Sequence, residues 1–189
     1  MTRVALVTCA EYPELDGAAE SRGIAALRAR GIDAQPVVWT DSSVSWSSFD
    51  AVVIRSTWDY VENPEAFLEW ASSVPKLFNP HPVLKWNADK RYLLELAEAG
   101  VPIVPTVLVE PGQDCEFGDS GEFVIKPTVG IGALGVCRFD ATFDQQRGLA
   151  RVHAQQLLDA GLGVLVQPYQ RGIEMYGETS LIYLGGSFS

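Results

Sequence analysis

One lysine and three glycines lie between two short apolar runs in the stretch Phe123-Val-Ile-Lys126-Pro-Thr-Val-Gly130-Ile-Gly132-Ala-Leu-Gly135-Val-Cys-Arg-Phe139, which decides the fold. β-Branched and aromatic residues favour strands, so the stretch predicts a strand pair joined by a glycine-rich loop. Glycine amides can approach an anion closely because no Cβ lies in the way. Two interpretations stay open at this point: a flap that binds phosphate, or an ordinary glycine-rich hairpin.

Three known glycine motifs are excluded by what surrounds these glycines. The spacing Gly130-x-Gly132-x-x-Gly135 matches a dinucleotide fingerprint, but that fingerprint requires a following helix, and residues 136–139 have a strand pattern. A Walker loop ends in Lys-Ser or Lys-Thr, which is absent here. The protein-kinase loop precedes its lysine, whereas Lys126 comes before the glycines.

Composition sets the class of protein and excludes some partners. The chain has 189 residues, 47% of them hydrophobic, and no apolar run of membrane-spanning length. Its three cysteines have no metal-ligand spacing, and the N-terminus lacks the order of a signal peptide, so the sequence predicts a cytoplasmic protein with no membrane partner. A net charge of -10 argues against a nucleic-acid partner, since a polyanion would be repelled.

The first half of the chain has the pattern of a parallel α/β unit. We expect strands at 4–7, 36–39, 49–54 and 76–79, and helices starting at Asp16 or Gly17 and at Asn63-Pro64. The first helix would bury Ile24 and Leu27, and the second would bury Phe67, Trp70, Ala71 and Val74.

The second half is less regular. Residues 81–86 are expected to form a proline-broken connection, followed by a helix over 88–99 capped by Asn87. A later helix over 142–160 is expected to turn Leu149, Val152 and Leu157 inward, and further strands are expected at 101–109, 163–166 and 180–184. Because Gly185-Gly-Ser-Phe-Ser189 follows the last expected strand directly, we expect the chain to be a fragment of a longer protein.

Motifs along the whole chain resemble the ATP-grasp superfamily in order and spacing. They are Asp89-Lys90, Val101-Pro102, Phe123-Val-Ile-Lys126-Pro127 with its glycine loop, Val166-Gln-Pro-Tyr169 and Gly177-Glu178-Thr-Ser-Leu181. Three more are similar to the branch around the D-cycloserine-forming ligase, namely Arg55-Ser-Thr-Trp-Asp-Tyr60, Asn79-Pro80 and Trp86-Asn-Ala-Asp-Lys90.

The resemblance implies an α/β fold in three parts. Residues 1–87 would form a pre-ATP-grasp domain with a Rossmann-like parallel sheet, and residues 88–170 the small lobe with its glycine-rich flap. Residues 171–189 would be the truncated start of the large lobe.

It also implies an ATP site. Lys126 and Lys90 match the family's two ATP lysines, and the amides of Gly130, Gly132 and Gly135 would close on the phosphates. Gln167, Pro168 and Tyr169 match the hinge that pairs with adenine, and Glu178 matches a ribose-binding glutamate, with Glu174 as a second candidate. Each has a plainer alternative, such as a solvated lysine, a strand ending at proline or a surface carboxylate.

A substrate site is expected after the strand 49–54. Ligands of open parallel sheets bind at the carboxyl ends of the strands, where Arg55, Ser56 and Asp59 lie. Arg55 could clamp a substrate carboxylate and Asp59 could hold an amine. The alternative is that Arg55 and Asp59 pair with each other.

The family's reaction activates a small-molecule carboxylate, such as that of an amino acid, by phosphorylation from ATP before an amine attacks. The resemblance implies Mg²⁺ as a second cofactor, with ligands expected beyond Ser189, so residues 1–189 alone are expected not to turn over ATP. Family members are often dimers, which makes a homodimer one arrangement that the resemblance allows. The alternative function is a non-catalytic module that binds ATP or another ligand.

Overall fold

The computed structural model describes the backbone of residues 1–189 and every side chain except that of Leu184. Two compact units divide the chain. Unit 1 comprises residues 1–92 and 129–134, and unit 2 comprises residues 93–128 and 135–189. The boundaries expected after residues 87 and 170 stay predictions, but the expected α/β architecture that begins with a parallel sheet is confirmed. The second sheet is antiparallel, which sequence reasoning did not specify.

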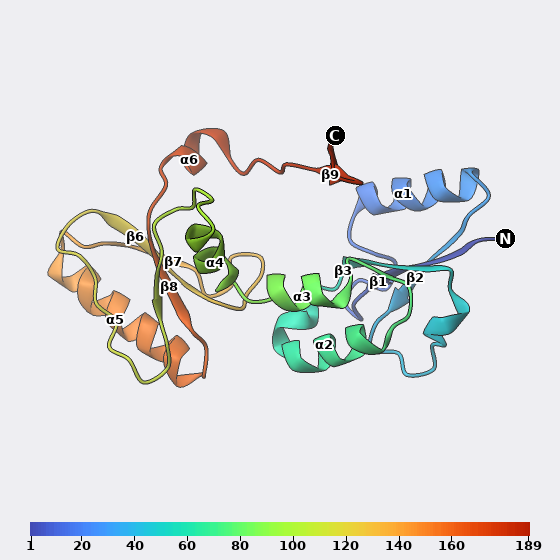
Figure 1. Cartoon of the computed structure of the whole chain (residues 1–189). Coiled ribbons are helices and arrows are strands. Elements are labelled where there is room, and N and C mark those ends of the chain that lie inside the picture. Colours follow the sequence, from blue (N-terminus) through green and yellow to red (C-terminus); the bar gives the residue numbers. More distant parts are fainter. The chain divides into compact units, whose positions relative to one another are not determined.

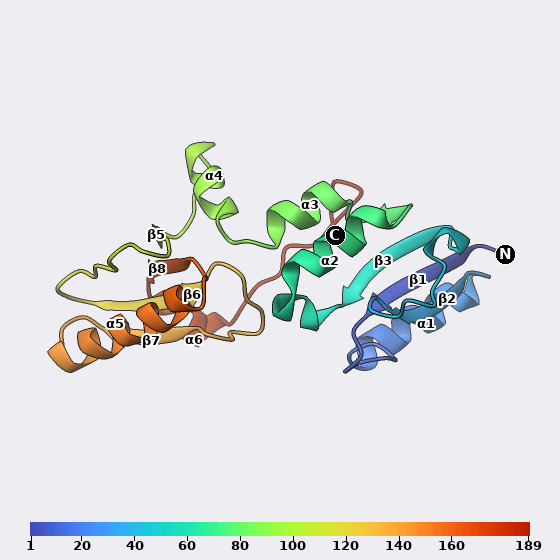
Figure 2. The same ribbon diagram turned by 90° about the horizontal axis from the view of Figure 1, so that it is seen from below.

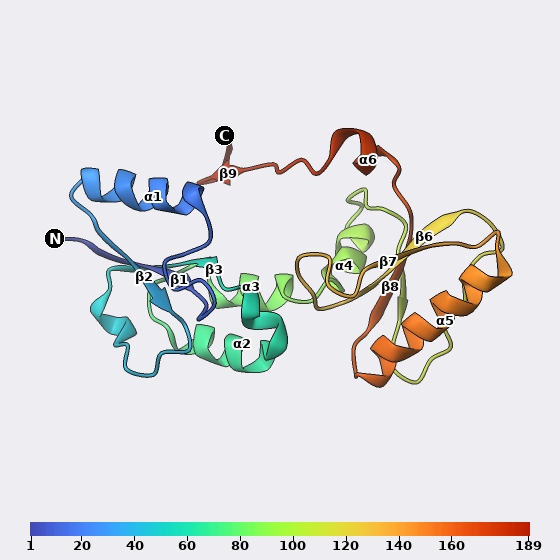
Figure 3. The same cartoon turned by 180° about the vertical axis from the view of Figure 1, so that it is seen from behind.

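Unit 1 is a three-layer α/β structure (Figures 1 and 3). Its sheet has the strand order β2-β1-β3-β4, all parallel, with β1 Arg3–Thr8, β2 Asp33–Val38, β3 Ala51–Ser56 and β4 Leu77–Phe78. Side chains alternate along β1, so that Val4 and Leu6 pack with Ile24 of α1, whereas Ala5 and Val7 pack with Val74 at the end of α2. The two faces of one apolar strand therefore build two cores.

The helices of unit 1 follow from their end signals. Helix α1 (Ala18–Ala29) follows Gly17, and α2 (Pro64–Ser73) starts with proline after Asn63, whose side chain accepts a hydrogen bond from the Ala66 amide. Short 3₁₀ turns, η1 (Trp46–Ser48) and η2 (Trp58–Glu62), flank β3.

Two predictions for residues 81–99 were wrong: that residues 81–86 form a connection, and that the following helix begins at residue 88. Residues expected to be a connection form α3 (His81–Asn87), because a proline in the first turn of a helix costs no hydrogen bond. The next helix, α4 (Tyr92–Glu98), begins later than expected, and Asn87 lies in the last turn of α3. The Asp89 carboxylate accepts a hydrogen bond of 2.9 Å from the Arg91 amide, a local turn that competes with helix.

Unit 2 contains an antiparallel sheet of order β5-β8-β6-β7 (Figure 2). Its strands are β5 Val107–Val109, β6 Glu122–Pro127, β7 Cys137–Asp140 and β8 Val164–Pro168. The expected strand, glycine loop and strand are confirmed, since β6 and β7 pair antiparallel around residues 128–136. The core lies between one face of this sheet and α5 (Asp144–Asp159).

The inward face of α5 was predicted wrongly. Leu149 and Val152 are exposed, while Ala150, Ala154 and Leu158 are buried against the sheet. Alanines at i and i+4 let the helix approach the strands closely, and the larger residues lie on other faces. Leu157, the third residue expected inward, is partly buried.

The last residues form short elements. Helix α6 (Gly172–Tyr176) precedes a hairpin of β9 (Tyr183–Leu184) and β10 (Ser187–Phe188), so the strand expected at 180–184 is shorter than predicted. Among the described helices, none combines the length and hydropathy needed to span a bilayer.

Candidate functional site

The sheet face opposite α5 carries three of the residues predicted to bind nucleotide. Phe123 and Ile125 of β6 pack against α5, so Lys126 points to the other face by strand alternation. On the same face, Gln167 of β8 is the direct partner of Val124, and the Tyr169 amide donates a hydrogen bond of 2.9 Å to the Glu122 carbonyl oxygen. Segments distant in sequence thus bring Lys126, Gln167 and Tyr169 to one surface of unit 2.

Lys126 is a half-buried cation. Its side chain forms no hydrogen bond or ion pair with any other residue that the structure describes. Burial lowers the pKa of its ammonium below the ordinary value, because desolvation disfavours the charged form. Such a group is stabilised by an anion, and phosphate oxygens are suitable partners.

The hinge residues differ in exposure. Gln167 is buried, and its Nε2 donates a hydrogen bond of 2.7 Å to Thr106 Oγ1, which fixes the amide. Pro168 is exposed and ends β8, and Tyr169 is half-buried. Glu178, the first ribose candidate, is exposed in the segment after α6.

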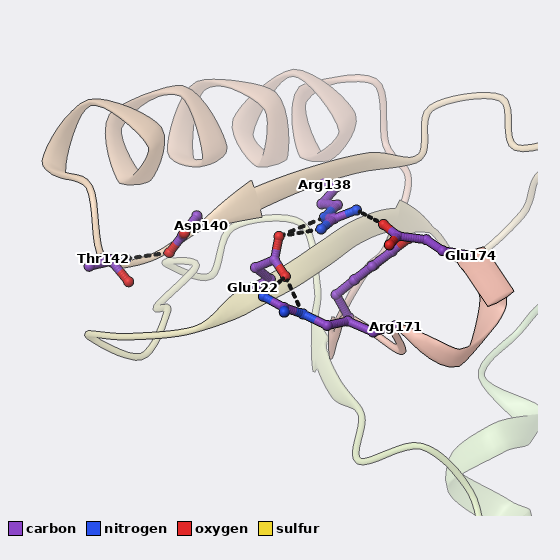
Figure 4. Close-up of polar contacts among 7 residues, drawn as sticks. Glu122, Arg138, Asp140, Thr142, Arg171 and Glu174 are labelled. Carbon is purple, nitrogen blue, oxygen red and sulfur yellow. Dashed lines mark hydrogen bonds and ion pairs between the residues drawn. The ribbon is translucent and has the colours of Figure 1, made fainter.

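A cluster of five residues lies at the hinge. It comprises four charged residues that Figure 4 labels, Glu122, Arg138, Arg171 and Glu174, together with Tyr169. Sequence reasoning named only Tyr169 and Glu174 among them. Arg138 binds both glutamates, and Arg171 binds Glu122 at 2.7 Å. Hydrogen bonds from Arg138 lower the pKa of both carboxyl groups, so both are ionised at neutral pH.

The glycine loop is divided between the units, with Gly130 and Gly132 in unit 1 and Gly135 in unit 2. In unit 1, Lys90 Nζ donates a hydrogen bond of 2.7 Å to the carbonyl oxygen of Gly130. In unit 2, Gly135 has a φ of 73°, and a Cβ there would lie 3.2 Å from Pro127 Cδ. Glycine is therefore required at Gly135 by both conformation and space.

Unit 1 has a pocket of about 300 Å³ at the carboxyl ends of β3 and β4. Its lining comprises Ile54, Arg55, Thr57, Trp58, Tyr60, Phe67, Asn79, Leu84, Asn87, Ala88 and Ile131. Arg55 is the one predicted substrate residue among them. Sequence reasoning did not assign a role to Thr57, Asn79 or Ile131, although Thr57 and Asn79 directly follow strand ends, a position that could have indicated them.

The predicted substrate residues have partners that were not expected. Arg55 binds Glu20 through Nε and Nη2, with the shortest contact at 2.5 Å, and this pair raises the pKa of the guanidinium. The Asp59 carboxylate accepts a hydrogen bond of 2.8 Å from Trp39 Nε1. Ser56 is buried, and its hydroxyl accepts from the Asp16 amide at 3.3 Å. Arg55 and Asp59 therefore do not pair with each other, and their substrate roles stay predictions.

Comparison with known proteins identifies the first half of the chain. Residues 4–79 match the family model for the N-terminal domain of D-cycloserine synthetase DcsG. This segment is therefore similar to the DcsG N-terminal domain family. Over 179 residues the chain is 39% identical to the cycloserine biosynthesis protein DcsG of Streptomyces lavendulae, with 87% of this chain and 58% of that protein covered. The chain thus spans less than two thirds of the curated relative, and the resemblance to the DcsG branch is confirmed.

Solved structures extend the likeness to both units. A crystal structure of DcsG matches with a TM-score of 0.85 and 35% identity, covering 99% of this chain and 66% of that one. The RimK-domain ATP-grasp protein of Sphaerobacter thermophilus matches with a TM-score of 0.62 and 20% identity, covering 89% of this chain and 64% of that one. D-alanine–D-alanine ligase of Bacillus anthracis matches with a TM-score of 0.60 and 14% identity, covering 90% of this chain and 58% of that one. The fold predicted from the motifs, that of ATP-grasp ligases, is confirmed.

Proposed function

We propose that the protein is an ATP-dependent ligase that activates the carboxylate of a small amino acid or similar molecule for attack by an amine. The observation that carries this proposal is the half-buried ammonium of Lys126, which has no partner among the described residues and lies on one sheet face with Gln167 and Tyr169. The 39% identity of the chain to DcsG supports it. A structural neighbour adds support, since the D-alanine–D-alanine ligase of Bacillus anthracis was crystallised in complex with ATP.

Each residue has a role that its surroundings allow. The Lys126 ammonium would neutralise phosphate charge, which also relieves its own desolvation. Gln167 and Tyr169 would flank the adenine, and the amides of the glycine loop would bind phosphate oxygens. Bound ATP supplies the phosphoryl group that turns the carboxylate into an acyl phosphate. Lys90, Glu178 and the glycines keep the nucleotide roles that the resemblance implies, as proposals.

The pocket beside Arg55 supports the substrate half of the proposal. It is large enough for a small amino acid, and one guanidinium lies on its wall. Within the described residues, no group of three or more His, Cys, Asp and Glu side chains could hold a metal ion. No step proposed for this chain uses a metal.

Calorimetric titration of a non-hydrolysable ATP analogue tests the proposal. The wild type should bind, and Lys126→Met should bind at least tenfold more weakly, the effect of about 1.4 kcal/mol. Lys85→Met, which removes an exposed lysine of α3, is the matched control and should bind like the wild type. Equal affinity in the Lys126 variant would refute the site. If the protein as encoded in full binds the analogue but releases no ADP from ATP over a panel of amino acids, the non-catalytic module is favoured.

A further inference from the structure

Arg138 is separated from the hinge strand β8 by β6, yet it contacts Tyr169 of the predicted hinge and Glu174 of α6. It is on β7, directly opposite Val124 of β6, so it shares the sheet face that carries Lys126. Its Cζ lies 3.7 Å from the centroid of the Tyr169 ring, and its Nη1 binds Glu174 Oε1. The Tyr169 hydroxyl donates a hydrogen bond of 3.0 Å to the same Glu174 oxygen. Arg138, Tyr169 and Glu174 therefore each contact the other two.

The orientation of Arg138 is itself fixed. Its Nε donates a hydrogen bond of 2.9 Å to Glu122 Oε1, and Nη2 binds the same oxygen. Arg171 takes the other oxygen of Glu122, at 2.9 Å from Nε and 2.7 Å from Nη2. Both oxygens of Glu122 are therefore occupied, and its role is to hold the two guanidinium groups (Figure 4).

Glu174 is engaged on one side only. Its Oε1 receives both Arg138 and Tyr169, whereas Oε2 makes no hydrogen bond within the described part of the chain. A carboxylate held by one oxygen presents the other in a defined direction, as an acceptor for a ligand hydroxyl. The mutual arrangement of Tyr169 and Glu174 thus depends on a residue of another strand.

A flexible exposed ion pair contributes little stability, but a planar guanidinium that also stacks on an aromatic ring selects one rotamer for each partner. Ordering binding residues before the ligand arrives removes part of the entropy cost of binding. We propose that Arg138 is a positioning residue that pre-orders Tyr169 and Glu174 for the adenosine part of the nucleotide, an inference that rests on the proposed function.

Titration of two probes tests this role: a non-hydrolysable ATP analogue and inorganic tripolyphosphate. Arg138→Met should bind the ATP analogue at least tenfold more weakly but tripolyphosphate within twofold of the wild type, because Lys126 is unchanged. Arg138→Lys keeps the positive charge but lacks the planar guanidinium. Its affinity for the analogue should therefore fall almost as much as that of Arg138→Met. Comparable losses for both probes in Arg138→Met would mean direct phosphate binding and overturn the positioning role.

Arg171→Met is the matched control, since Arg171 also binds Glu122 and carries the same charge. Among the described residues, the Arg171 side chain makes no hydrogen bond or ion pair with Tyr169 or Glu174, and the backbone bond from the Glu174 amide to the Arg171 carbonyl oxygen is kept in the variant. Its affinity for the analogue should stay within twofold. In a Glu174→Gln background, the further loss caused by Arg138→Lys should shrink to less than threefold, as expected for residues that act as a unit. Additive losses would overturn the inference. Failure of the wild type to bind the analogue would instead refute the proposed function and, with it, this role.

Discussion

Lys90 Nζ donates a hydrogen bond of 2.7 Å to the carbonyl oxygen of Gly130, so a residue next to α4 fixes one point of the glycine loop. Lys90→Met removes this charge-assisted bond, and we expect faster amide hydrogen exchange over residues 129–134 in the absence of nucleotide. Lys85→Met is the control, because Lys85 is exposed on α3. Identical exchange in the two variants would show that Lys90 does not restrain the loop.

Lys126 should make stability depend on pH. Burial lowers its pKa, so between that pKa and the ordinary value of 10.5 the unfolded chain binds more protons than the folded one, and stability rises with pH. Below this window the full cost of the buried charge is present. Lys126→Met should therefore melt at a higher temperature than the wild type at neutral pH. The difference should narrow as the pH rises through the window, and thermal scans across that range would show it. A constant difference would contradict the prediction.

Arg55 should affect substrate binding more than stability. Its pair with Glu20 is partly exposed, so Arg55→Ala should change the free energy of unfolding by less than about 1 kcal/mol. If Arg55 clamps a carboxylate, the same variant should bind amino-acid probes at least tenfold more weakly in calorimetry. Glu20→Gln breaks the pair and keeps the guanidinium, so it separates the two effects. Unchanged probe affinity in Arg55→Ala would remove the substrate role.

Two glycines of the loop should respond differently to alanine. Gly132 and Gly135 both have positive φ, but only at Gly135 would a Cβ meet Pro127, at 3.2 Å. Gly132→Ala should cost about 1–2 kcal/mol for the left-handed conformation, and Gly135→Ala should cost more. Chemical denaturation measures both values. A smaller loss at Gly135 would mean that the loop adjusts without strain.

Helix α5 gives a test of its packing face. Ala154 is fully buried, so Ala154→Leu should overpack the core and cost about 1–3 kcal/mol of stability. Leu149→Ala, on the exposed face, should stay within about 0.5 kcal/mol. Gly148→Ala should stabilise the protein by about 0.5–1 kcal/mol, since a Cβ there meets no atom within 4 Å. A larger loss of stability for Leu149→Ala than for Ala154→Leu would mean that Leu149 faces the core, as the sequence predicted.

Local patterns predicted local structure well. The parallel sheet of unit 1 follows from apolar runs and from the Asn63-Pro64 cap, and the β6–β7 hairpin follows from its strand pattern on either side of three glycines. In α5 the pattern failed, because residue size was taken as the sign of burial, whereas close packing selected alanine. At α3, proline was taken as a break, although the first turn tolerates it.

Long-range partners could not be read from the sequence. Glu122 and Arg171 are 49 positions apart, and Arg55 and Glu20 are 35 apart, so only the folded chain shows which charges meet. The position of Lys126 at the end of β6, just before the glycine loop, was predictable because its neighbours in sequence carry the motif. The contacts of Arg138 with Tyr169 and Glu174 were not predictable, since Arg138 comes from a strand whose own sequence contains no binding motif.

The aromatic cluster of unit 1 has a practical consequence. All five tryptophans lie within residues 1–92, and Trp70 packs 5.2 Å from Trp46 and 5.8 Å from Trp39 between ring centroids. Intrinsic tryptophan fluorescence therefore reports the unfolding of unit 1. Energy transfer between the clustered indoles should be lost when unit 1 unfolds. Unit 2 contains no tryptophan, so this signal isolates the unfolding of unit 1 from that of unit 2 without any labelling.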